Sequence, residues 1–317
     1  MKLLVTGGCG FIGSNFILYL FKKYPKYKII NIDSLTYAGN NLKDVHNTKT
    51  YQFVKGDICD RDLIRDLVAK SDIVVNFAAE SHVDRSIEDS SNSVRTNIVG
   101  THVLLDAVRY YQKKIHHIST DEVFGELGSS GFFDEETPYN PRSPYSASKA
   151  GADHLVRAYH NTYGLPITIT HCSNNYGPFQ HPEKIIPKFI ISLLNDQKVQ
   201  LYGDGSNIRD WIHVSDHCKA LDLVIHNGKD GESYCIGGEC EKTNKQITKD
   251  ILRLMDKNDS YIEYVEDRKG HDKRYAIDNT KIRKLGWKPG YIWEKGLSDT
   301  IQWYIEKKDW WENLIFK

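Results

Sequence analysis

The sequence lacks both a long apolar run and an excess of one charge. No stretch of its 317 residues approaches the roughly 20 consecutive apolar residues that span a bilayer. Lysine plus arginine number 42, as do aspartate plus glutamate, so the formal net charge is zero. These features exclude a membrane-spanning helix and a global attraction to nucleic acid or anionic membranes. Because Lys2–Thr6 reads as a strand and not as a signal peptide, we expect a cytoplasmic protein.

The sequence also lacks the cysteine and histidine spacings of a disulfide or metal framework. Its six cysteines are scattered and form no C-x-x-C pair, and no His and Cys set has zinc spacing. His116 and His117 are adjacent in a strand-like run, so their side chains point to opposite faces. We therefore expect no metal site, and we expect the cysteines to be small buried side chains.

Short apolar runs alternate with amphipathic stretches through the first half of the chain. The expected strands are Leu3–Thr6, Lys28–Ile32, Tyr51–Lys55, Ile73–Phe77, Ile115–Ser119 and Ile167–His171. The expected helices are Ser14–Lys23, Asp60–Ala69, Ser93–Tyr111 and Ser146–Tyr163. This alternation predicts an α/β fold of the Rossmann type, a doubly wound parallel sheet with helices on both faces.

After about residue 176 the pattern becomes irregular and rich in glycine and proline, which predicts a smaller, loop-rich α/β C-terminal substrate domain. We expect residues 1–175 to form a dinucleotide-binding Rossmann domain and residues 176–317 to bind mainly the substrate. Within the segment 210–236, Trp211–Val214 and Ser233–Ile236 are expected to return to the first domain as short strands. Near the C-terminus one helical face is expected to hold Leu297, Ile301, Tyr304 and Ile305.

A glycine triplet joins the first expected strand to the first expected helix. Gly7, Gly10 and Gly13 have the spacing G-x-x-G-x-x-G, which permits a tight turn and a close approach of the backbone to a pyrophosphate. The N-terminus of the helix then presents free N–H groups to the phosphates. Asp33 ends the next strand, where its carboxylate can bind ribose hydroxyls and repel a 2′-phosphate. Together these residues predict a site for NAD rather than NADP, with Asp57 and Ile58 placed to meet the adenine.

Tyr145 and Lys149 are four residues apart at the start of an expected helix, so they share one helical face. An ammonium near a phenol stabilises the phenolate and lowers the pKa of the tyrosine from its usual value of about 10. Tyr145 could then accept a proton from a substrate hydroxyl while hydride leaves for a nicotinamide. Without the glycine triplet, the same spacing would more often be solvated helix surface.

Thr120, Asp121 and Glu122 follow the fifth expected strand, at the edge of the sheet where doubly wound folds bind their ligands. Two adjacent carboxyl groups can divide the roles of acid and base. A simple oxidation needs only the tyrosine and the lysine. The carboxyl pair therefore predicts a further proton-transfer step, the alternative being a solvated acidic turn.

The chain resembles the extended short-chain dehydrogenase/reductases, and within them the dTDP-glucose 4,6-dehydratases. The resemblance covers essentially the whole chain in order. It rests on Gly7–Gly13, Asp33, residues 78–84 (AAESHVD), Ser119–Val123 (STDEV), Tyr145 with Lys149, residues 173–178 (SNNYGP), residues 209–211 (RDW) and residues 268–272 (RKGHD). Sister epimerases and decarboxylases carry a different pair of residues at the positions of Asp121 and Glu122.

The resemblance implies a hydro-lyase that uses bound NAD. Tyr145, supported by Lys149 and Thr120, would remove the proton of the sugar 4-hydroxyl during oxidation at carbon 4. Glu122 would then remove the carbon 5 proton while Asp121 protonates the departing 6-hydroxyl, and hydride would return from NADH to carbon 6. The product would be a 4-keto-6-deoxy sugar nucleotide of deoxysugar biosynthesis, such as that of dTDP-rhamnose.

The resemblance also implies which residues bind the two ligands. The residues expected at the cofactor, besides the glycines, Asp33, Asp57, Ile58, Tyr145 and Lys149, are Phe11, Ile12, Ser34, Leu35, Thr36, Ala78, Ala79, Ser81, Thr96 and Asn175. The residues expected at the sugar nucleotide are Ser81, Thr120, Asn174, Lys184, Ile185, Tyr202, Arg209, Asn244, Arg268 and His271. The two helices Ser93–Tyr111 and Ser146–Tyr163 would pair across a homodimer interface.

Several alternatives stay open at this point. A UDP-glucose 4,6-dehydratase or another NAD-dependent sugar-nucleotide enzyme of the same fold would share most of these motifs. An NAD-sensing protein without catalysis predicts a degraded catalytic set, whereas all five residues of the set are present. Small departures from the family pattern, outside the catalytic set, are Cys9, Phe124, His171, Phe179 and Cys235.

Overall fold

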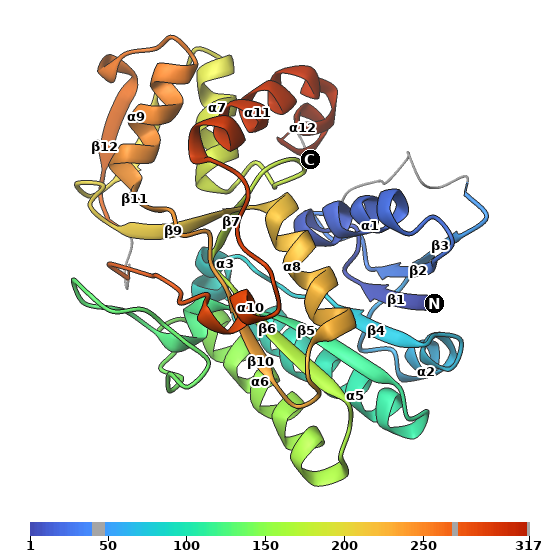
Figure 1. The fold of residues 1–317 in the computed structure, drawn as a ribbon. Helices are drawn as coiled ribbons and strands as arrows, with labels where there is room; N and C mark the ends of the chain where they lie inside the picture. Colours follow the sequence, from blue (N-terminus) through green and yellow to red (C-terminus); the bar gives the residue numbers. More distant parts are fainter. Residues whose placement is uncertain (40–47, 268–271, 316–317) are drawn as a thin grey trace.

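A seven-stranded parallel sheet forms one half of the molecule (Figure 1). The computed structural model describes residues 1–39, 48–267 and 272–315. The strand order is β10-β6-β5-β4-β1-β2-β3, and every pair of neighbours is parallel. These strands are β1 (Lys2–Thr6), β2 (Lys28–Asp33), β3 (Tyr51–Lys55), β4 (Ile73–Asn76), β5 (Lys114–Thr120), β6 (Ile167–Cys172) and β10 (Ser233–Ile236). The expected doubly wound Rossmann sheet is confirmed.

Helices cover both faces of this sheet because its strands are apolar on both sides. In β1, Leu3 and Val5 face one layer and Leu4 faces the other. The first layer contains α1 (Phe11–Lys23), α8 (Val214–Asn227) and α10 (Thr280–Lys284). The second layer contains α2 (Arg61–Ala69), α5 (Thr101–Tyr110) and α6 (Pro144–Tyr163). The strand order reverses between β1 and β4, which is where a doubly wound fold opens its ligand crevice.

The stretch expected as one helix, 93–111, is helical but not uniform. It consists of α4 (Ser91–Ser93), a π-helix η1 (Val94–Gly100) and α5. The short helix α3 (Val83–Glu88) precedes it. The wide π turn directs the buried Asn97 side chain to the main chain of Glu80 and to the Ser148 hydroxyl, so η1 is tied to the loop after β4 and to α6.

The other half of the molecule is smaller and richer in loops (Figure 1). A three-stranded sheet contains β7 (Asn174–Tyr176), β9 (Ile208–His213) and β11 (Glu241–Thr243), and β8 (Val199–Tyr202) pairs with β12 (Ile262–Val265). A third apolar core is built mainly by α7 (Ile185–Leu194), α9 (Asn244–Leu254), α11 (Trp293–Glu306) and α12 (Lys308–Ile315). The described residues also contain two 3-10 turns, η2 (Asp121–Phe124) and η3 (Asp259–Tyr261).

One expectation for the second half of the chain is wrong. Ser233–Ile236 does return to the main sheet as β10, but residues 208–213 form β9 in the separate three-stranded sheet. The helix expected near the C-terminus is α11, in which Leu297, Ile301 and Tyr304 are buried and Ile305 is 47% exposed. The division of the chain at residue 175 stays a prediction. In the described part of the chain, no helix has the length and apolar character needed to cross a membrane.

Candidate active site

The glycine-rich loop packs so closely that its glycines cannot be replaced without a shift. Gly7 has a φ of +66°, and a Cβ there would lie 2.6 Å from the main chain of Ala78. A Cβ on Gly13 would lie 2.5 Å from the carbonyl oxygen of Gly7. The N-cap residue of α1 is Gly10, which has no side chain that could accept a hydrogen bond from the first turn, so the N–H groups of that turn are available to an anionic ligand.

Asp33 ends β2 beside this loop. Its Oδ2 accepts a 2.9 Å hydrogen bond from the N–H of Cys9, and its Oδ1 accepts one of 2.8 Å from the N–H of Leu35. The carboxylate is thereby fixed in the position from which a ribose would be bound. The side chain of Leu35 is 39% exposed and lines no cavity described here, so its part in this site is the main-chain N–H.

A cavity of about 470 Å³, called here the inner cavity, runs along the carboxyl ends of the parallel strands. It brings together the expected cofactor residues other than Leu35, together with the expected catalytic set. The lining includes Gly7, Gly10, Phe11, Ile12, Gly13, Asp33, Ser34, Thr36, Asp57, Ile58, Ala78, Ala79, Ser81, Thr96, Thr120, Asp121, Glu122, Tyr145, Lys149 and Asn175. The sheet thus gathers side chains from most of the first half of the sequence at one edge.

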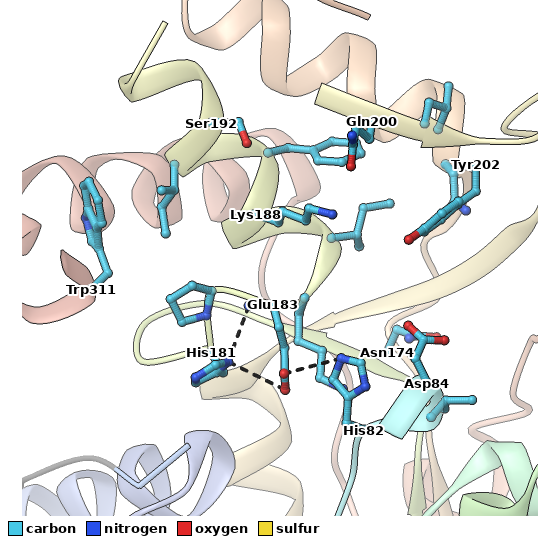
Figure 2. A pocket seen from close by; sticks show the side chains of 18 of the residues that line it. His82, Asp84, Asn174, His181, Glu183, Lys188, Ser192, Gln200, Tyr202 and Trp311 are labelled. Atoms are coloured by element: carbon cyan, nitrogen blue, oxygen red, sulfur yellow. Dashed lines mark hydrogen bonds and ion pairs between the residues drawn. The ribbon is translucent and has the colours of Figure 1, made fainter. Parts of the chain in front are cut away.

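A second cavity of about 1050 Å³, called here the outer cavity, lies between α7, α12 and the loops of the second half (Figure 2). Its lining includes Asn174, Lys184, Ile185, Tyr202, Arg209 and Asn244, all expected at the sugar nucleotide. Arg268 and His271, expected at the same ligand, lie outside the described residues. Five residues line both cavities: Glu122, Asn174, His181, Glu183 and Lys184.

Arg209 is held in a fixed position at the outer cavity. Its guanidinium donates to the carbonyl oxygens of Ile208, Asp272 and Lys273 at 2.8–3.4 Å. The same group lies 4.3 Å from the ring centroid of Tyr275. A fixed guanidinium is suited to an anionic ligand, because little side-chain entropy is lost on binding.

The sequence reasoning missed an acidic and histidine cluster between the two cavities. In Figure 2, Glu183 points between His181 and His82, and its carboxylate lies 3.6 Å from His181 Nδ1 and 3.4 Å from His82 Nε2. Tyr37 also donates to Glu183 at 3.1 Å. These residues come from the β2–β3 loop, the start of α3 and the loop before α7, so no local spacing links them in the sequence.

The start of α6 positions Tyr145 and Lys149. Ser143 and Ser146 form a reciprocal capping box, and Pro144 occupies the first turn, where its missing N–H costs nothing. Both functional side chains are buried, at 8% exposure for Tyr145 and 4% for Lys149. The expected shared face of the helix therefore points into the inner cavity.

The expected lowering of the Tyr145 pKa below its usual value is wrong for the protein chain without ligands. Burial raises the pKa of Tyr145 well above its usual range, and the carboxyl groups of Glu122 and Asp121 act in the same direction. A hydrogen bond with Thr120 acts against them. The ammonium of Lys149 instead donates to the carbonyl oxygen of Ile118 at 2.7 Å, and burial lowers its own pKa. The depth of this site, which the sequence did not reveal, outweighs the ammonium.

Asp121 and Glu122 are neighbours in η2 but have different surroundings. Asp121 is buried, with 2% exposure, and Glu122 is partly exposed to both cavities. Burial and then the nearby Glu122 raise the pKa of Asp121 well above its usual range, which favours the protonated form of this carboxyl. Among the described residues, Asp121 Oδ2 has no hydrogen-bond partner. A protonated carboxyl with an open oxygen is suited to donate a proton to a ligand.

Comparison with known proteins agrees with this geometry. The family model described as GDP-mannose 4,6 dehydratase matches residues 4–300. The chain belongs to the GDP-mannose 4,6 dehydratase family. Within this family the chain is 47% identical to a dTDP-glucose 4,6-dehydratase of Xanthomonas campestris over 98% of this chain and 95% of that one. The resemblance to the dTDP-glucose 4,6-dehydratases is thereby confirmed.

Two other members of the family extend the comparison. The chain is 50% identical to the low-salt glycan biosynthesis protein Agl12 of Haloferax volcanii, over 96% of this chain and 99% of that one. It is also similar to DesIV, a dTDP-glucose 4,6-dehydratase of Streptomyces venezuelae that was crystallised with NAD bound. That structure has a TM-score of 0.96 and 48% identity and covers 99% of this chain and all of that one.

Proposed function

We propose that this protein dehydrates dTDP-glucose to dTDP-4-keto-6-deoxy-glucose, which makes it a hydro-lyase. The observation that carries this proposal is the convergence of Thr120, Asp121, Glu122, Tyr145 and Lys149 on one cavity at the carboxyl ends of the sheet. A dehydrogenase would need only the tyrosine and lysine. The carboxyl pair adds the acid and the base that an elimination of water requires.

The inner cavity fits NAD. The close packing of Gly7 and Gly13 leaves the first turn of α1 open to a pyrophosphate, and Asp33 is placed for a ribose. Asp57 and Ile58 line the same cavity near the end of β3. When bound, NAD would supply a hydride acceptor at carbon 4 and, once reduced, a hydride donor at carbon 6. Tyr145 and Lys149 line the same cavity, and we propose that the reacting end of such a ligand would lie toward them.

Tyr145 is proposed to take the proton of the sugar 4-hydroxyl. The hydroxyl of Thr120 lowers the pKa of the phenol, against the effect of burial, and so favours the phenolate. Lys149 lines the same cavity and brings a positive charge close to the reacting hydroxyl. Because burial raises the pKa of Tyr145, the charge near the phenol decides how readily it acts as a base.

Asp121 and Glu122 are proposed to divide the elimination between them. Burial and the neighbouring Glu122 raise the pKa of Asp121 and so favour its protonated form, which is the form that could protonate the departing 6-hydroxyl. Glu122 is the more exposed of the two and faces both cavities, where it can remove the carbon 5 proton of a sugar. One carboxyl group then acts as the acid and the other as the base.

The outer cavity is proposed to bind the sugar nucleotide. Arg209 and Lys184 provide cationic groups for a diphosphate, and Tyr202, Ile185 and Asn244 line the same space. The five residues shared by the two cavities would lie where the hexose meets the cofactor. This arrangement agrees with the relatives, which are named for action on dTDP-glucose.

The proposal is tested by supplying the purified protein with dTDP-glucose and, in a parallel reaction, with UDP-glucose. We expect the alkaline absorbance and the mass of a 4-keto-6-deoxy product from dTDP-glucose. Thymine differs from uracil by one methyl group, which is worth about 1–3 kcal/mol in an apolar pocket, so UDP-glucose should react roughly ten-fold less efficiently or worse. Formation of UDP-galactose without a keto sugar would identify an epimerase and contradict the proposal.

Two further expectations remain proposals. The homodimer would bury η1, α5 and α6 of each subunit against a second copy, and a cytoplasmic location would be tested by cell fractionation. The redox-sensing alternative is disfavoured because the whole catalytic set lines one cavity.

A further inference from the structure

A chain of buried polar side chains runs beneath the inner cavity, from the glycine-rich loop to Lys149. The N–H of Ala78 donates to Thr6 Oγ1 at 3.3 Å, and the Thr6 hydroxyl donates to Asn76 Oδ1 at 2.6 Å. The amide nitrogen of Asn76 lies 3.0 Å from Nδ1 of His117. Thr6, Asn76 and His117 are each at most 1% exposed.

The direction of these hydrogen bonds fixes the tautomer of His117. A main-chain N–H can only donate, so the Thr6 oxygen accepts from Ala78. The Thr6 hydroxyl uses its own hydrogen to donate a hydrogen bond to the side-chain carbonyl oxygen of Asn76. The Asn76 amide then presents its N–H to Nδ1 of His117, which must accept. The ring proton of His117 is therefore on Nε2, because burial and then the nearby Lys149 lower the pKa of His117 to about 4 and keep the ring neutral.

Nε2 of His117 lies between Lys149 and a carboxylate. It is 3.4 Å from Oδ1 of Asp153 and 3.5 Å from Nζ of Lys149. Asp153 is one turn after Lys149 on α6, is fully buried, and its Oδ2 also accepts from Ser119 at 2.7 Å and from Tyr139 at 3.1 Å. Since Nε2 carries a hydrogen, it cannot accept from Lys149, and its N–H faces the carboxylate of Asp153, whose Oδ1 has no hydrogen-bond partner among the described residues.

The carboxylate of Asp153 is held in its charged form. Burial by itself would raise the pKa of Asp153, but the neighbouring imidazoles of His117, at 3.4 Å, and His171, at 3.1 Å, outweigh burial and hold the pKa well below its usual range. Burial lowers the pKa of Lys149, and the charge of Asp153 opposes this effect. The other ionisable groups around Lys149 are Tyr145 on α6 and Cys172 on β6, besides Asp121 and Glu122 on η2.

We infer that Asp153 and His117 are positioning residues for Lys149, with Asp153 supplying the buried negative charge that keeps the ammonium protonated and His117 placing its Nε2–H beside Asp153 so that the carboxylate stays charged. One N–H of Lys149 then donates to the carbonyl oxygen of Ile118, and its other N–H groups are available to the inner cavity, which Tyr145 also lines. The effect of Asp153 on the reaction rate rests on the proposed function, whereas its effect on the protonation of Lys149 does not.

The direct test measures the protonation of Lys149 in the protein without any ligand. Trace labelling with acetic anhydride over a range of pH, read by peptide mass spectrometry, follows the neutral amine. In Asp153→Asn the labelling midpoint of Lys149 should move at least one pH unit lower, with about ten-fold more label near neutral pH. His117→Leu should move the midpoint in the same direction, and His117→Gln, which keeps an N–H donor, should retain the parental midpoint.

His116→Leu is the matched control. His116 is the adjacent residue on β5 and equally buried, but its ring bonds Thr168 and Thr170 on the opposite face of the sheet. The His116→Leu protein should lose stability without any change in the labelling midpoint of Lys149. If Asp153→Asn does not fold, the comparison of His117→Leu with His116→Leu decides the same question. An unchanged midpoint in a folded Asp153→Asn or His117→Leu protein would overturn the inference.

The kinetic arm uses the first half-reaction, the appearance of NADH on mixing with dTDP-glucose. Loss of the ammonium should raise the pKa of Tyr145 further. Asp153→Asn should therefore lower kcat about 10²-fold with little change in KM. The acid limb of its pH–rate profile should shift to higher pH. If the parent protein does not react with dTDP-glucose, the proposed function fails, while the labelling result still decides the role of Asp153.

Discussion

Asp33 Oδ2 accepts a 2.9 Å hydrogen bond from the main-chain N–H of Cys9, so the end of β2 holds the glycine-rich loop in place. The carboxylate expected to select the cofactor thus also shapes the loop expected to bind its phosphates. Because a second N–H, from Leu35, donates to Oδ1 at 2.8 Å, both oxygens are oriented before any ligand binds. Cofactor choice and loop geometry are coupled through one side chain.

The first prediction concerns this coupling. Asp33→Asn keeps the shape of the side chain but removes the charge that repels a 2′-phosphate. The ratio of NAD affinity to NADP affinity should fall at least about ten-fold, as measured by calorimetric titration of each dinucleotide. Asp60→Asn is the control, because Asp60 caps α2 outside the cavity and Asn caps a helix equally well. An unchanged ratio would remove Asp33 from the account of cofactor selection.

The second prediction concerns stability and pH. Since burial raises the pKa of Asp121 in the folded state, only the folded protein holds this proton once the pH exceeds the usual aspartate pKa near 4. Folding stability from this group therefore decreases as pH rises, by about 1.4 kcal/mol per unit until the folded group also ionises. Asp121→Asn removes this decrease.

The difference between the thermal midpoints of Asp121→Asn and the parent should accordingly grow as the pH rises above about 4, until Asp121 ionises in the folded parent. Scanning calorimetry at a series of pH values measures this margin. Asp62→Asn, on the exposed surface of α2, should show no such growth. A margin that is constant or shrinks with pH would mean that Asp121 is ionised in the folded protein.

The third prediction concerns the homodimer. The π-helix η1 presents Val94 and Val99 to solvent at 45% exposure each, beside helices expected to form the interface. The parent should have the mass of a dimer by light scattering at micromolar concentration, and Val99→Asp should shift it toward the monomer. Ile305→Asp, at a 47% exposed position on α11, should leave the mass unchanged. A monomeric parent would contradict this interface.

The main sheet was predictable because its strands are apolar on both faces and are separated by clear helix and turn signals. β3 agrees to the residue, and β1, β2, β4, β5 and β6 agree within one residue at each end. The carboxyl ends of parallel strands meet at one edge, so the location of Asp33, Thr120 and Tyr145 near one another followed from the topology. This part of the site was therefore predictable from the spacing of the motifs and the order of the strands.

Other features depend on distances that no local pattern encodes. The π turn of η1 changes only the hydrogen-bond register, and the helical periodicity of 93–111 gave no sign of it. The raised pKa of Tyr145 follows from burial, and the contact of Asp153 with His117 joins α6 to β5. The cluster around Glu183 likewise joins three loops that are distant in the sequence.

The central claim is that Glu122 is the base of the elimination and Tyr145 the base of the oxidation. Glu122→Gln should therefore still oxidise carbon 4 and fail to lose water, because an amide cannot accept the carbon 5 proton. A positioned base is worth about 10²–10⁴ in rate, so the two steps should separate clearly. Asp121→Asn should behave similarly but exchange the carbon 5 proton with solvent faster than Glu122→Gln.

The most direct measurement is rapid mixing of Glu122→Gln, loaded with NAD, with dTDP-glucose in deuterated water, following NADH absorbance and the mass of the sugar nucleotide. NADH should accumulate, with little 4-keto-6-deoxy product and little deuterium at carbon 5. Tyr145→Phe, as the matched variant, should form no NADH on the same time scale. Product formation by Glu122→Gln at the parental rate, or rapid NADH formation by Tyr145→Phe, would contradict the assignment of the two bases.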